Sequence, residues 1–180
     1  MNKINFQNLP NTTTPLNASN MNQLQTNVEN AITEAVEQCA PEIITGYIDR
    51  KSYTVSQSWT AINLAPFDSY VSTTNKITLT SSGLKIGEGV SKILVSASCR
   101  GIDHSAFSGD KAFSIYKNGN RVTEIALESY ITNQNSWCEQ SVSPALIECE
   151  EDDVFSLYFG SDGTGTGDLL GEWLTIQVIE

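Results

Sequence analysis

Residues that could perform catalysis occur in the chain, but their spacing does not favour a catalytic site. His104 is the only histidine, and Asp103 and Ser105 are its direct neighbours in the sequence. A Ser-His-Asp triad needs three side chains that meet through hydrogen bonds in a line, and adjacent residues on one loop do not have that geometry. We therefore predict that the chain has no catalytic residue and is not an enzyme.

Carboxylates are concentrated near one predicted turn. They are Glu148, Glu150, Glu151, Asp152 and Asp153. In enzymes that cleave glycosidic bonds, two carboxyl groups stand roughly 5 to 9 Å apart across a cleft. A charge run at a hairpin turn is instead typical of a loop exposed to water, which is the structure we expect here. A sugar-cleaving enzyme is the alternative of another class, and it would require a defined acid pair in a cleft.

Acidic residues on loops are also candidate ligands for a cation. Calcium prefers clustered oxygen ligands, which Asp162, Asp168, Glu172 or the acidic turn could supply. Their spacing matches no EF-hand loop. We predict no metal site and no cofactor, and we leave open a cation that would stabilise these loops.

The aromatic side chains allow two interpretations. The residues concerned are Trp59, Tyr130, Trp137, Tyr158 and Trp173. Such side chains pack in a core or along an oligomer axis, and they also form platforms on which sugar rings stack. Trp137 follows the polar run of residues 132–136, and an exposed aromatic among Asn and Gln suits carbohydrate. Trp137 is therefore the recognition candidate.

The cysteines do not form a metal-binding or redox motif. Cys39, Cys99, Cys138 and Cys149 include no CxxC pair and no zinc-like spacing. In a cytosol they stay reduced, and we interpret them as small buried apolar residues. Cys138 and Cys149 could lie on adjacent strands, so a disulfide between them is left open.

Charge and hydropathy exclude two classes of partner. The chain of 180 residues has 10 Lys and Arg against 21 Asp and Glu, and its net charge is −11. This charge repels the phosphate backbone, so we expect no nucleic acid partner. No stretch approaches the roughly 20 apolar residues of a membrane span, and the N-terminus has no apolar segment of a secretion signal. We expect a protein that is made in a cytosol and does not insert into a membrane.

The sequence predicts three successive parts. Residues 1–18 are polar and rich in Asn and Thr, as in an extended attachment arm. Residues 19–40 form a helix, because Ser19 or Asn20 can cap it and no Gly or Pro follows before Pro41. Residues 41–180 are long enough for one head domain of usual size.

The predicted helix has an apolar stripe. Its positions follow a 3-4-3-4 spacing at Met21, Leu24, Val28, Ala31 and Ala35, widened by Ile32, Val36 and Cys39. Such a stripe suits either a helix packed on its own domain or one that self-associates. Because the following region is complete in strands, copies of the same helix are the simplest partner. The candidates for contact in a stalk are Met21, Leu24, Val28, Ile32 and Ala35.

After Pro41, apolar residues recur at every second position. The clearest runs are Ile93, Val95, Ala97 and Cys99, and Tyr53, Val55, Trp59 and Ala61. Further strands are predicted within residues 76–80, 112–116, 121–127, 142–149, 154–159 and 173–179. Asn118-Gly119 between two such runs predicts a tight hairpin, and Ser161 to Asp168 predict a flexible loop.

This spacing predicts an antiparallel sandwich or barrel without a long helix in residues 53–180. In the last strand, Leu174, Ile176 and Val178 should face the core, with Thr175 and Gln177 on the opposite face.

Two stretches resemble known families. Residues 14–22 read TPLNASNMN, which resembles the TPLNAxNLN start of minor structural proteins of phages that infect Gram-positive bacteria. From Tyr53 to Glu180 the chain is similar to the jelly rolls of the complement and tumour-necrosis-factor superfamily and their phage relatives. That similarity rests on three stretches: residues 87–93 (GEGVSKI), 114–119 (SIYKNG) and 173–179 (WLTIQVI).

These resemblances imply a mainly β protein, an antiparallel jelly-roll sandwich preceded by an N-terminal helix that forms a trimeric stalk. They also imply a bacteriophage virion structural protein, a short trimeric fibre or adhesin whose head is a candidate to bind a host-surface glycan. Its partners would be two further copies of itself, other virion proteins through the arm, and host carbohydrate. A capsid-decorating protein without a specific receptor and a glycan-cleaving tail enzyme are the alternatives.

Overall fold

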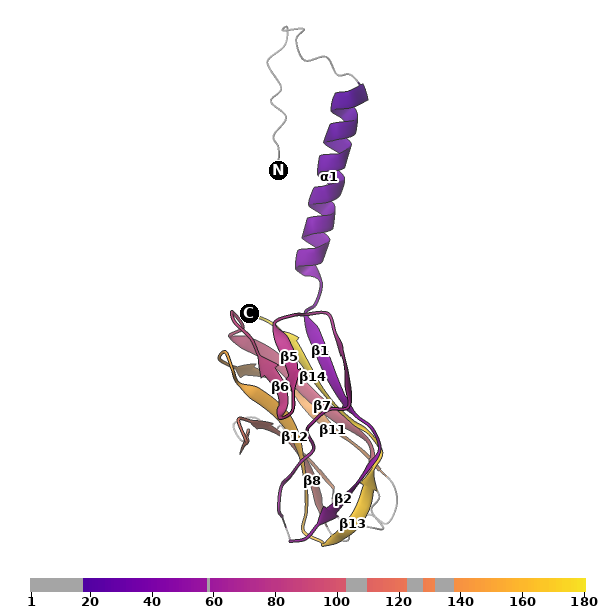
Figure 1. Ribbon diagram of the computed structural model, residues 1–180, viewed down its shortest axis with the longest axis vertical. Helices are drawn as coiled ribbons and strands as arrows, with labels where there is room; N and C mark the ends of the chain where they lie inside the picture. The colour runs from indigo at the N-terminus through magenta and orange to yellow at the C-terminus, as the bar shows by residue number, and fades with distance from the viewer. Residues whose placement is uncertain (1–17, 58, 103–109, 123–127, 132–137) are drawn as a thin grey trace. The chain divides into compact units, whose positions relative to one another are not determined.

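A computed structural model describes residues 18–57, 59–102, 110–122, 128–131 and 138–180 (Figure 1). The attachment arm predicted for residues 1–18 lies outside these residues except for Ala18. The chain divides into two compact units with the boundary between Ala40 and Pro41.

The first unit contains one helix, α1 (Ala18–Cys39). Its polar side chains bond locally: Gln25 donates to Glu29 over 2.7 Å, and Thr33 Oγ1 donates to the carbonyl of Glu29 over 2.9 Å. The first turn has no acidic residue and the last turn has no basic residue. The helix dipole is therefore uncompensated, and the helix depends on packing for stability. It is not apolar enough to cross a membrane.

The second unit is a sandwich of two antiparallel sheets. The first sheet has the order β2-β13-β7-β14-β1-β4, with β11 on the other side of β7. Its strands are β1 (Ile43–Ile48), β2 (Lys51–Val55), β4 (Ser69–Ser72), β7 (Lys92–Ile102), β11 (Cys138–Glu148), β13 (Gly165–Leu169) and β14 (Glu172–Val178).

The second sheet has the order β10-β8-β12-β6-β5, with β3 beside β12 and β9 beside β8. Its strands are β3 (Ile62–Asn63), β5 (Ile77–Thr80), β6 (Gly83–Ile86), β8 (Lys111–Lys117), β9 (Asn120–Arg121), β10 (Glu128–Ile131) and β12 (Val154–Ser161). Within the described part of residues 41–180 no helix occurs.

The core lies between the two sheets, and the predicted alternation positions it. Along β7, Ile93, Val95, Ala97 and Cys99 are buried, as predicted. Along β14, Leu174 and Ile176 are fully buried while Thr175 and Gln177 are partly exposed, and Val178 packs against the core. The predicted register of the last strand is confirmed.

The predicted Asn-Gly hairpin is present between β8 and β9. Asn118 has φ 52° and Gly119 has φ 75°. Lys117 pairs with Asn120 across the turn. Both central residues adopt the positive φ that a two-residue type I′ turn requires.

Two predictions about the first sheet are wrong. The strand predicted from Tyr53 to Ala61 ends at Val55. Farther along, Trp59 adopts φ 57°, which no strand accommodates. The loop predicted from Ser161 to Asp168 contains β13, which pairs with β2. Strand β1 was not predicted. The part of the predicted strand at residues 123–127 lies outside the described residues.

The cysteines agree with the expectation of reduced, buried thiols where they are described. Cys99 and Cys149 are buried and do not belong to a disulfide. The suggestion that Cys138 and Cys149 lie on adjacent strands is wrong, because Cys138 begins β11 and Cys149 directly follows its end. Eleven steps of a strand span roughly 35 Å, so a disulfide within one chain is excluded. The side chains of Cys39 and Cys138 lie outside the described structure.

Replacing Gly83 by alanine should destabilise the second unit by about 3 kcal/mol or more. Gly83 has φ 144°, and a Cβ there would lie 2.2 Å from the carbonyl oxygen of Phe155, so backbone would have to move. Gly89 is the control, because it also has positive φ (78°) but a Cβ there meets nothing within 4 Å. Urea unfolding should separate the variants; equal midpoints for Gly83→Ala and Gly89→Ala would contradict the steric explanation.

Candidate functional site

Large apolar side chains of α1 are exposed along one stripe. Leu24, Val28, Ile32 and Val36 are 39 %, 49 %, 59 % and 64 % exposed. Ala35 is also exposed, whereas the side chain of Met21 lies outside the described residues. Spaced four residues apart, the four large residues form a continuous row on the helix surface. A row of this kind is unfavourable in water and is typical of a helix that packs against a partner.

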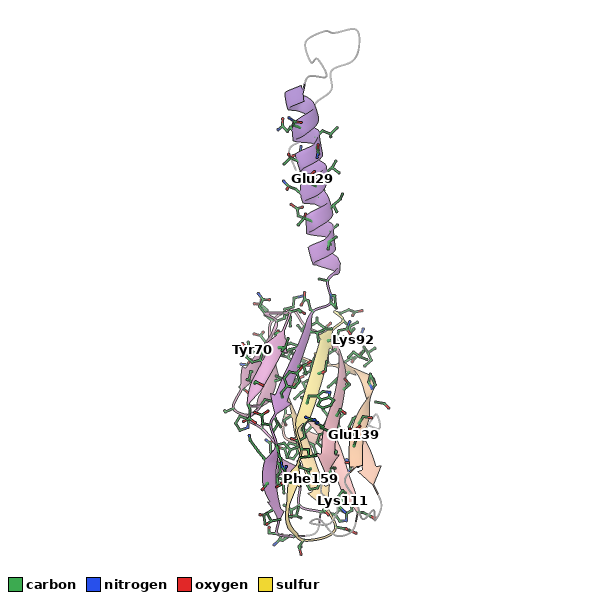
Figure 2. All side chains as sticks on the ribbon, turned by 90° about the vertical axis from the view of Figure 1, so that its right-hand side faces the viewer. Glu29, Tyr70, Lys92, Lys111, Glu139 and Phe159 are labelled. Carbon is green, nitrogen blue, oxygen red and sulfur yellow. The ribbon has the colours of Figure 1, made fainter. Side chains whose placement is uncertain are left out.

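The middle of the first sheet turns an uncharged patch away from the core, which we call the neutral face. Charged outward residues of the same strands, Lys92, Arg100, Glu139 and Glu148, lie toward the ends of β7 and β11. Figure 2 shows β1, β14, β7 and β11, which carry most of this face, side by side. The neutral face consists of Ile43, Thr45, Tyr47, Val71, Leu94, Ser96, Ser98, Ser141, Leu146, Trp173, Thr175 and Gln177. None of these side chains is charged, although 17 % of the chain is.

Strand register arranges the neutral face in rows. Tyr47 pairs with Trp173, and Leu94 pairs with Leu146. Between those rows, the hydroxyls of Thr45 and Thr175 share a hydrogen bond of 2.9 Å. Depletion of charge together with exposed aromatics distinguishes the core of protein interfaces from other surface. The neutral face therefore has the composition of a protein–protein contact.

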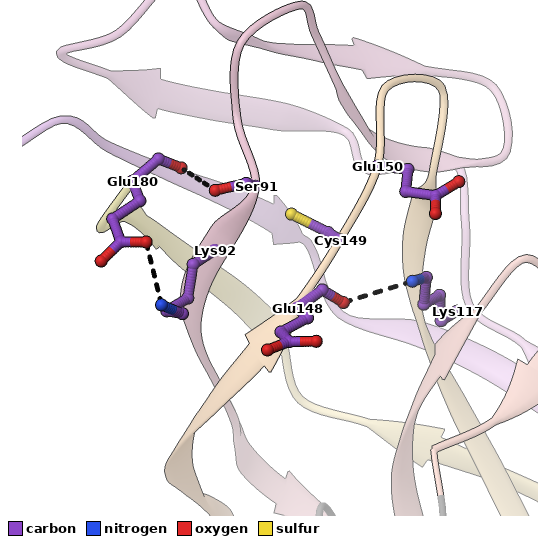
Figure 3. A pocket seen from close by; sticks show the side chains of 7 residues that line it. All are labelled: Ser91, Lys92, Lys117, Glu148, Cys149, Glu150 and Glu180. Carbon is purple, nitrogen blue, oxygen red and sulfur yellow. Dashed lines mark hydrogen bonds and ion pairs between the residues drawn. The ribbon is translucent and has the colours of Figure 1, made fainter.

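A polar pocket of about 590 Å³ opens at the end of the sandwich (Figure 3). Its lining residues are Ser91, Lys92, Lys117, Glu148, Cys149, Glu150 and Glu180. Both lysines are engaged by the protein: Lys92 pairs with Glu180 at 2.9 Å, and Lys117 pairs with Asp153 at 2.7 Å. The hydrogen bond to Glu180 raises the pKa of Lys92, which holds the amine charged.

The thiol in this pocket is not activated. Burial raises the pKa of Cys149, and the charge of Asp153 raises it further. A nucleophilic cysteine requires the opposite shift. Cys149 is therefore not an activated nucleophile, and the ion pairs of Lys92 and Lys117 stabilise this end of the sandwich.

An aromatic pocket of about 170 Å³ lies on the outward face of the second sheet. It is lined by Trp59, Ala61, Ala112, Ser114, Tyr116, Arg121, Tyr158, Phe159 and Gly160. The rings of Tyr116 on β8 and Tyr158 on β12 stack with centroids 3.8 Å apart. Trp59 is 45 % exposed.

A row of polar side chains is buried inside the first sheet. Glu172 and Gln140 both pair in register with Cys99, and Glu172 is 1 % exposed. Among the residues that the structure describes, no hydrogen-bond partner lies near Glu172 Oε2, either side-chain polar atom of Gln140, or the hydroxyl of Tyr53. Burial raises the pKa of Glu172 to about 8, so this carboxyl is mostly protonated at neutral pH. Burial and the nearby Glu172 also raise the pKa of Tyr53.

The residues that were considered as cation ligands are separated and each has a different environment. Asp162 accepts the backbone N–H of Asp110 over 2.6 Å, Asp168 pairs with Arg50, and Glu172 lies in the core. Over the described ranges, no group of three His, Cys, Asp or Glu side chains is placed to hold a metal ion.

The acidic run lies at the turn after β11, as predicted, but one of its members is not solvated. Asp152 pairs with Lys85 at 2.6 Å on the surface. Asp153 is buried at the turn, where it accepts hydrogen bonds from Asn118 and the backbone of Glu150. Although burial opposes its ionisation, the bonds from Lys117, Glu150 and Asn118 lower the pKa of Asp153. Asp153 therefore links the turn between β11 and β12 to the β8–β9 hairpin through Asn118.

The aromatic candidates are distributed over different surfaces. Trp173 belongs to the neutral face, and Trp59 and Tyr158 line the aromatic pocket. Trp137, His104, Asp103, Ser105 and the side chain of Tyr130 lie outside the described residues. Sequence reasoning missed the neutral face, although the absence of charge from residues 94–98 and 173–177 was a visible signal. It missed the aromatic pocket because Trp59 was assigned to a strand.

No protein-family model and no curated protein matches the sequence. Solved structures share its fold at low identity. Murine APRIL matches with a TM-score of 0.53 and 7 % identity, covering 78 % of this chain and 100 % of that one. The vertex protein P5 of PRD1, a phage, matches with a TM-score of 0.53 and 11 % identity, covering 77 % and 97 %.

Eiger TNF from S. frugiperda matches with a TM-score of 0.52 and 10 % identity, covering 78 % of this chain and 94 % of that one. The chain is therefore a mainly antiparallel β-sandwich of the TNF-like jelly-roll fold, with one N-terminal helix.

Proposed function

We propose that this chain is a non-enzymatic structural protein of a bacteriophage particle, a short homotrimeric fibre or adhesin. Three observations support the proposal: the neutral face, the apolar stripe of α1, and a fold shared with proteins that include the PRD1 vertex protein. The resemblance of residues 14–22 to phage minor structural proteins points in the same direction.

In this proposal, each part of the chain has its own role. Residues 1–18 attach to other virion proteins, residues 19–40 form a stalk of three helices, and residues 41–180 form the head. The head meets the host surface and binds carbohydrate there. The protein is made in the host cytoplasm and incorporated into the virion.

The neutral face is the main observation that supports the proposal. On an antiparallel sheet that faces water, outward positions are normally polar and often charged. Here Tyr47, Trp173, Leu94 and Leu146 occupy outward positions among Ser and Thr, and a contact confined to this patch would desolvate no charge. Copies of the same chain supply a surface of matching composition, as a closed homo-oligomer requires.

Labelling of purified virions with an antibody against residues 41–180 tests the assignment to the particle. We expect particles that carry the label at defined positions, and free head should compete with particles for host cells. Particles without label would refute the virion assignment. Labelled particles whose adsorption is unaffected by free head would indicate a capsid decoration without a receptor.

The full chain should sediment as a trimer at micromolar concentration, and a chain that begins at Pro41 should form a trimer of lower stability. The shorter chain must begin there because Ile44 is fully buried and β1 pairs with both β14 and β4. Loss of the helix removes the burial of its stripe but leaves the neutral face. A monomeric full chain would refute the proposal, and a dimer would contradict the implied trimer.

A further inference from the structure

We propose that the aromatic pocket is a carbohydrate subsite that takes a single neutral pyranose ring. This inference rests on the proposed function, because it assigns the head's contact with host glycan to Trp59, Tyr116, Tyr158 and Arg121.

The size of the pocket suits one six-membered ring. Its volume is about 170 Å³, and a protein cavity of about 150 Å³ accommodates benzene. The floor is made of the small residues Ala112, Ser114 and Gly160, which lie at outward positions of β8 and β12. Ala112 pairs with Gly160, and Ser114 pairs with Tyr158. Small side chains on neighbouring strands leave the depression, and larger aromatic residues surround it.

The lining combines apolar surface with hydrogen-bonding groups. The indole of Trp59 and the stacked Tyr116 and Tyr158 rings present aromatic surface. Arg121, Ser114 and the two tyrosines carry polar atoms, and a guanidinium alone has five N–H donors. A pyranose has one face of C–H groups and an edge of hydroxyls, so it can use both kinds of surface. An aromatic ligand would use only the first.

The backbone holds Trp59 in an uncommon conformation at this position. Its φ is 57°, a region that bulky residues rarely occupy. Its N–H donates to the carbonyl of Ser161 over 2.7 Å. A Cβ at Gly160 would lie 3.7 Å from Trp59 Cε3, so the indole lies against the glycine on the pocket floor.

The fold itself does not need an indole at this position. Trp59 is 45 % exposed, and it is not a member of the buried core between the sheets. A strained backbone that presents an exposed aromatic ring beside a pocket is a feature of binding sites.

Titration of the full-length protein with methyl glycosides of neutral hexoses, followed by ligand-observed NMR, tests the inference. The variant Trp59→Gly removes the ring and tolerates φ 57° without strain, so it should remain folded. Tyr70→Ala is the control, because Tyr70 is an exposed aromatic (55 %) that does not line the pocket. We expect at least one glycoside to bind, with affinity reduced about tenfold or more in Trp59→Gly and unchanged in Tyr70→Ala.

Several outcomes would overturn the inference. They are an absence of binding by every glycoside, equal binding by wild type and Trp59→Gly, and equal binding by benzyl alcohol used as an aromatic probe. Virion labelling and the oligomeric state do not depend on Trp59. A labelled, trimeric particle protein that fails this titration would refute the subsite and leave the proposed function standing. Sugar binding by a protein that is absent from virions would refute the proposed function and leave the subsite standing.

Discussion

Replacing Val28 by aspartate should lower the association constant of the full-chain trimer at least a thousandfold. Val28 lies on the exposed stripe of α1, where association would bury it. Each buried valine contributes about 1.5 kcal/mol or more, so three copies contribute about 4.5 kcal/mol, and three carboxylates at one axis add repulsion. For a monomer–trimer equilibrium, the concentration of half-dissociation should then rise about thirtyfold. Sedimentation over a dilution series measures this shift.

Asn30→Asp is the matched control for this variant. This variant adds the same charge to the same exposed helix. Asn30 is two residues after Val28, which corresponds to about 200° of rotation, so it lies on the side of the helix opposite the stripe. Its half-dissociation concentration should stay close to that of the wild type. If both variants shift equally, total charge and not the stripe governs assembly. If neither shifts, the helices do not meet through Val28.

Replacing Glu172 by glutamine should stabilise the protein at pH 8 by about 3 to 5 kcal/mol and have little effect at pH 4.5. The folded protein holds the Glu172 proton up to about pH 8, whereas the ordinary pKa is 4.5. Between these values the folded state binds more protons than the unfolded state, so stability falls as the pH rises. At about 1.4 kcal/mol for each pH unit, the full loss is about 5 kcal/mol. Glutamine does not titrate and avoids the loss.

Urea unfolding at pH 4.5 and pH 8, at one fixed chain concentration, gives the comparison. Glu42→Gln is the control, because the pKa of Glu42 is shifted in the opposite direction. Its carboxylate pairs with Lys76 at 2.9 Å, and the hydrogen bond from Lys76 lowers its pKa. That variant should gain nothing at pH 8. A Glu172→Gln protein with the same pH dependence as the wild type would show that Glu172 ionises freely in the fold.

The parts of the fold that could be predicted are those in which successive inward positions carry apolar side chains. β7 meets this condition, and β14 meets it from Leu174 onward. β1 does not, because Gly46 occupies a buried position in it. A Cβ there would lie 2.8 Å from Phe67 Cγ, so the ring of Phe67 fills the space that a side chain of β1 would otherwise take. The core is continuous, but the alternation in the sequence is interrupted.

β13 could not be predicted because its stability comes from a distant partner. Its residues Gly165, Thr166 and Gly167 have the composition of a loop. They become a strand through pairing with β2, where Thr54 and Thr166 share a hydrogen bond of 2.7 Å. Local pattern contains no information about a contact between residues more than 100 positions apart.

The surfaces were partly within reach of the sequence. The apolar stripe of α1 follows from spacing alone, and the structure leaves it exposed. The buried Glu172 shares the inward face of Leu174 and Ile176 by spacing, but a carboxylate after Gly171 is typical of a turn, so the strand was expected to begin after it. The structure extends β14 to Glu172 and pairs it with Cys99 in the core. Trp59 escaped prediction for a related reason: the alternation continues in the sequence past Val55, where the strand ends, and does not reveal the positive φ of Trp59.

The position of β1 determines how the head responds to mechanical load. β1 is the first strand after α1, and it pairs with β14 on one side and β4 on the other. Tension along this strand therefore loads the hydrogen bonds of both ladders in shear, so that many bonds must break together before the strand slides. An edge strand pulled from its end would instead open one bond at a time. In the proposed attachment of this chain to a virion through its N-terminus, drag on the particle would enter the second unit through a strand that is flanked on both sides.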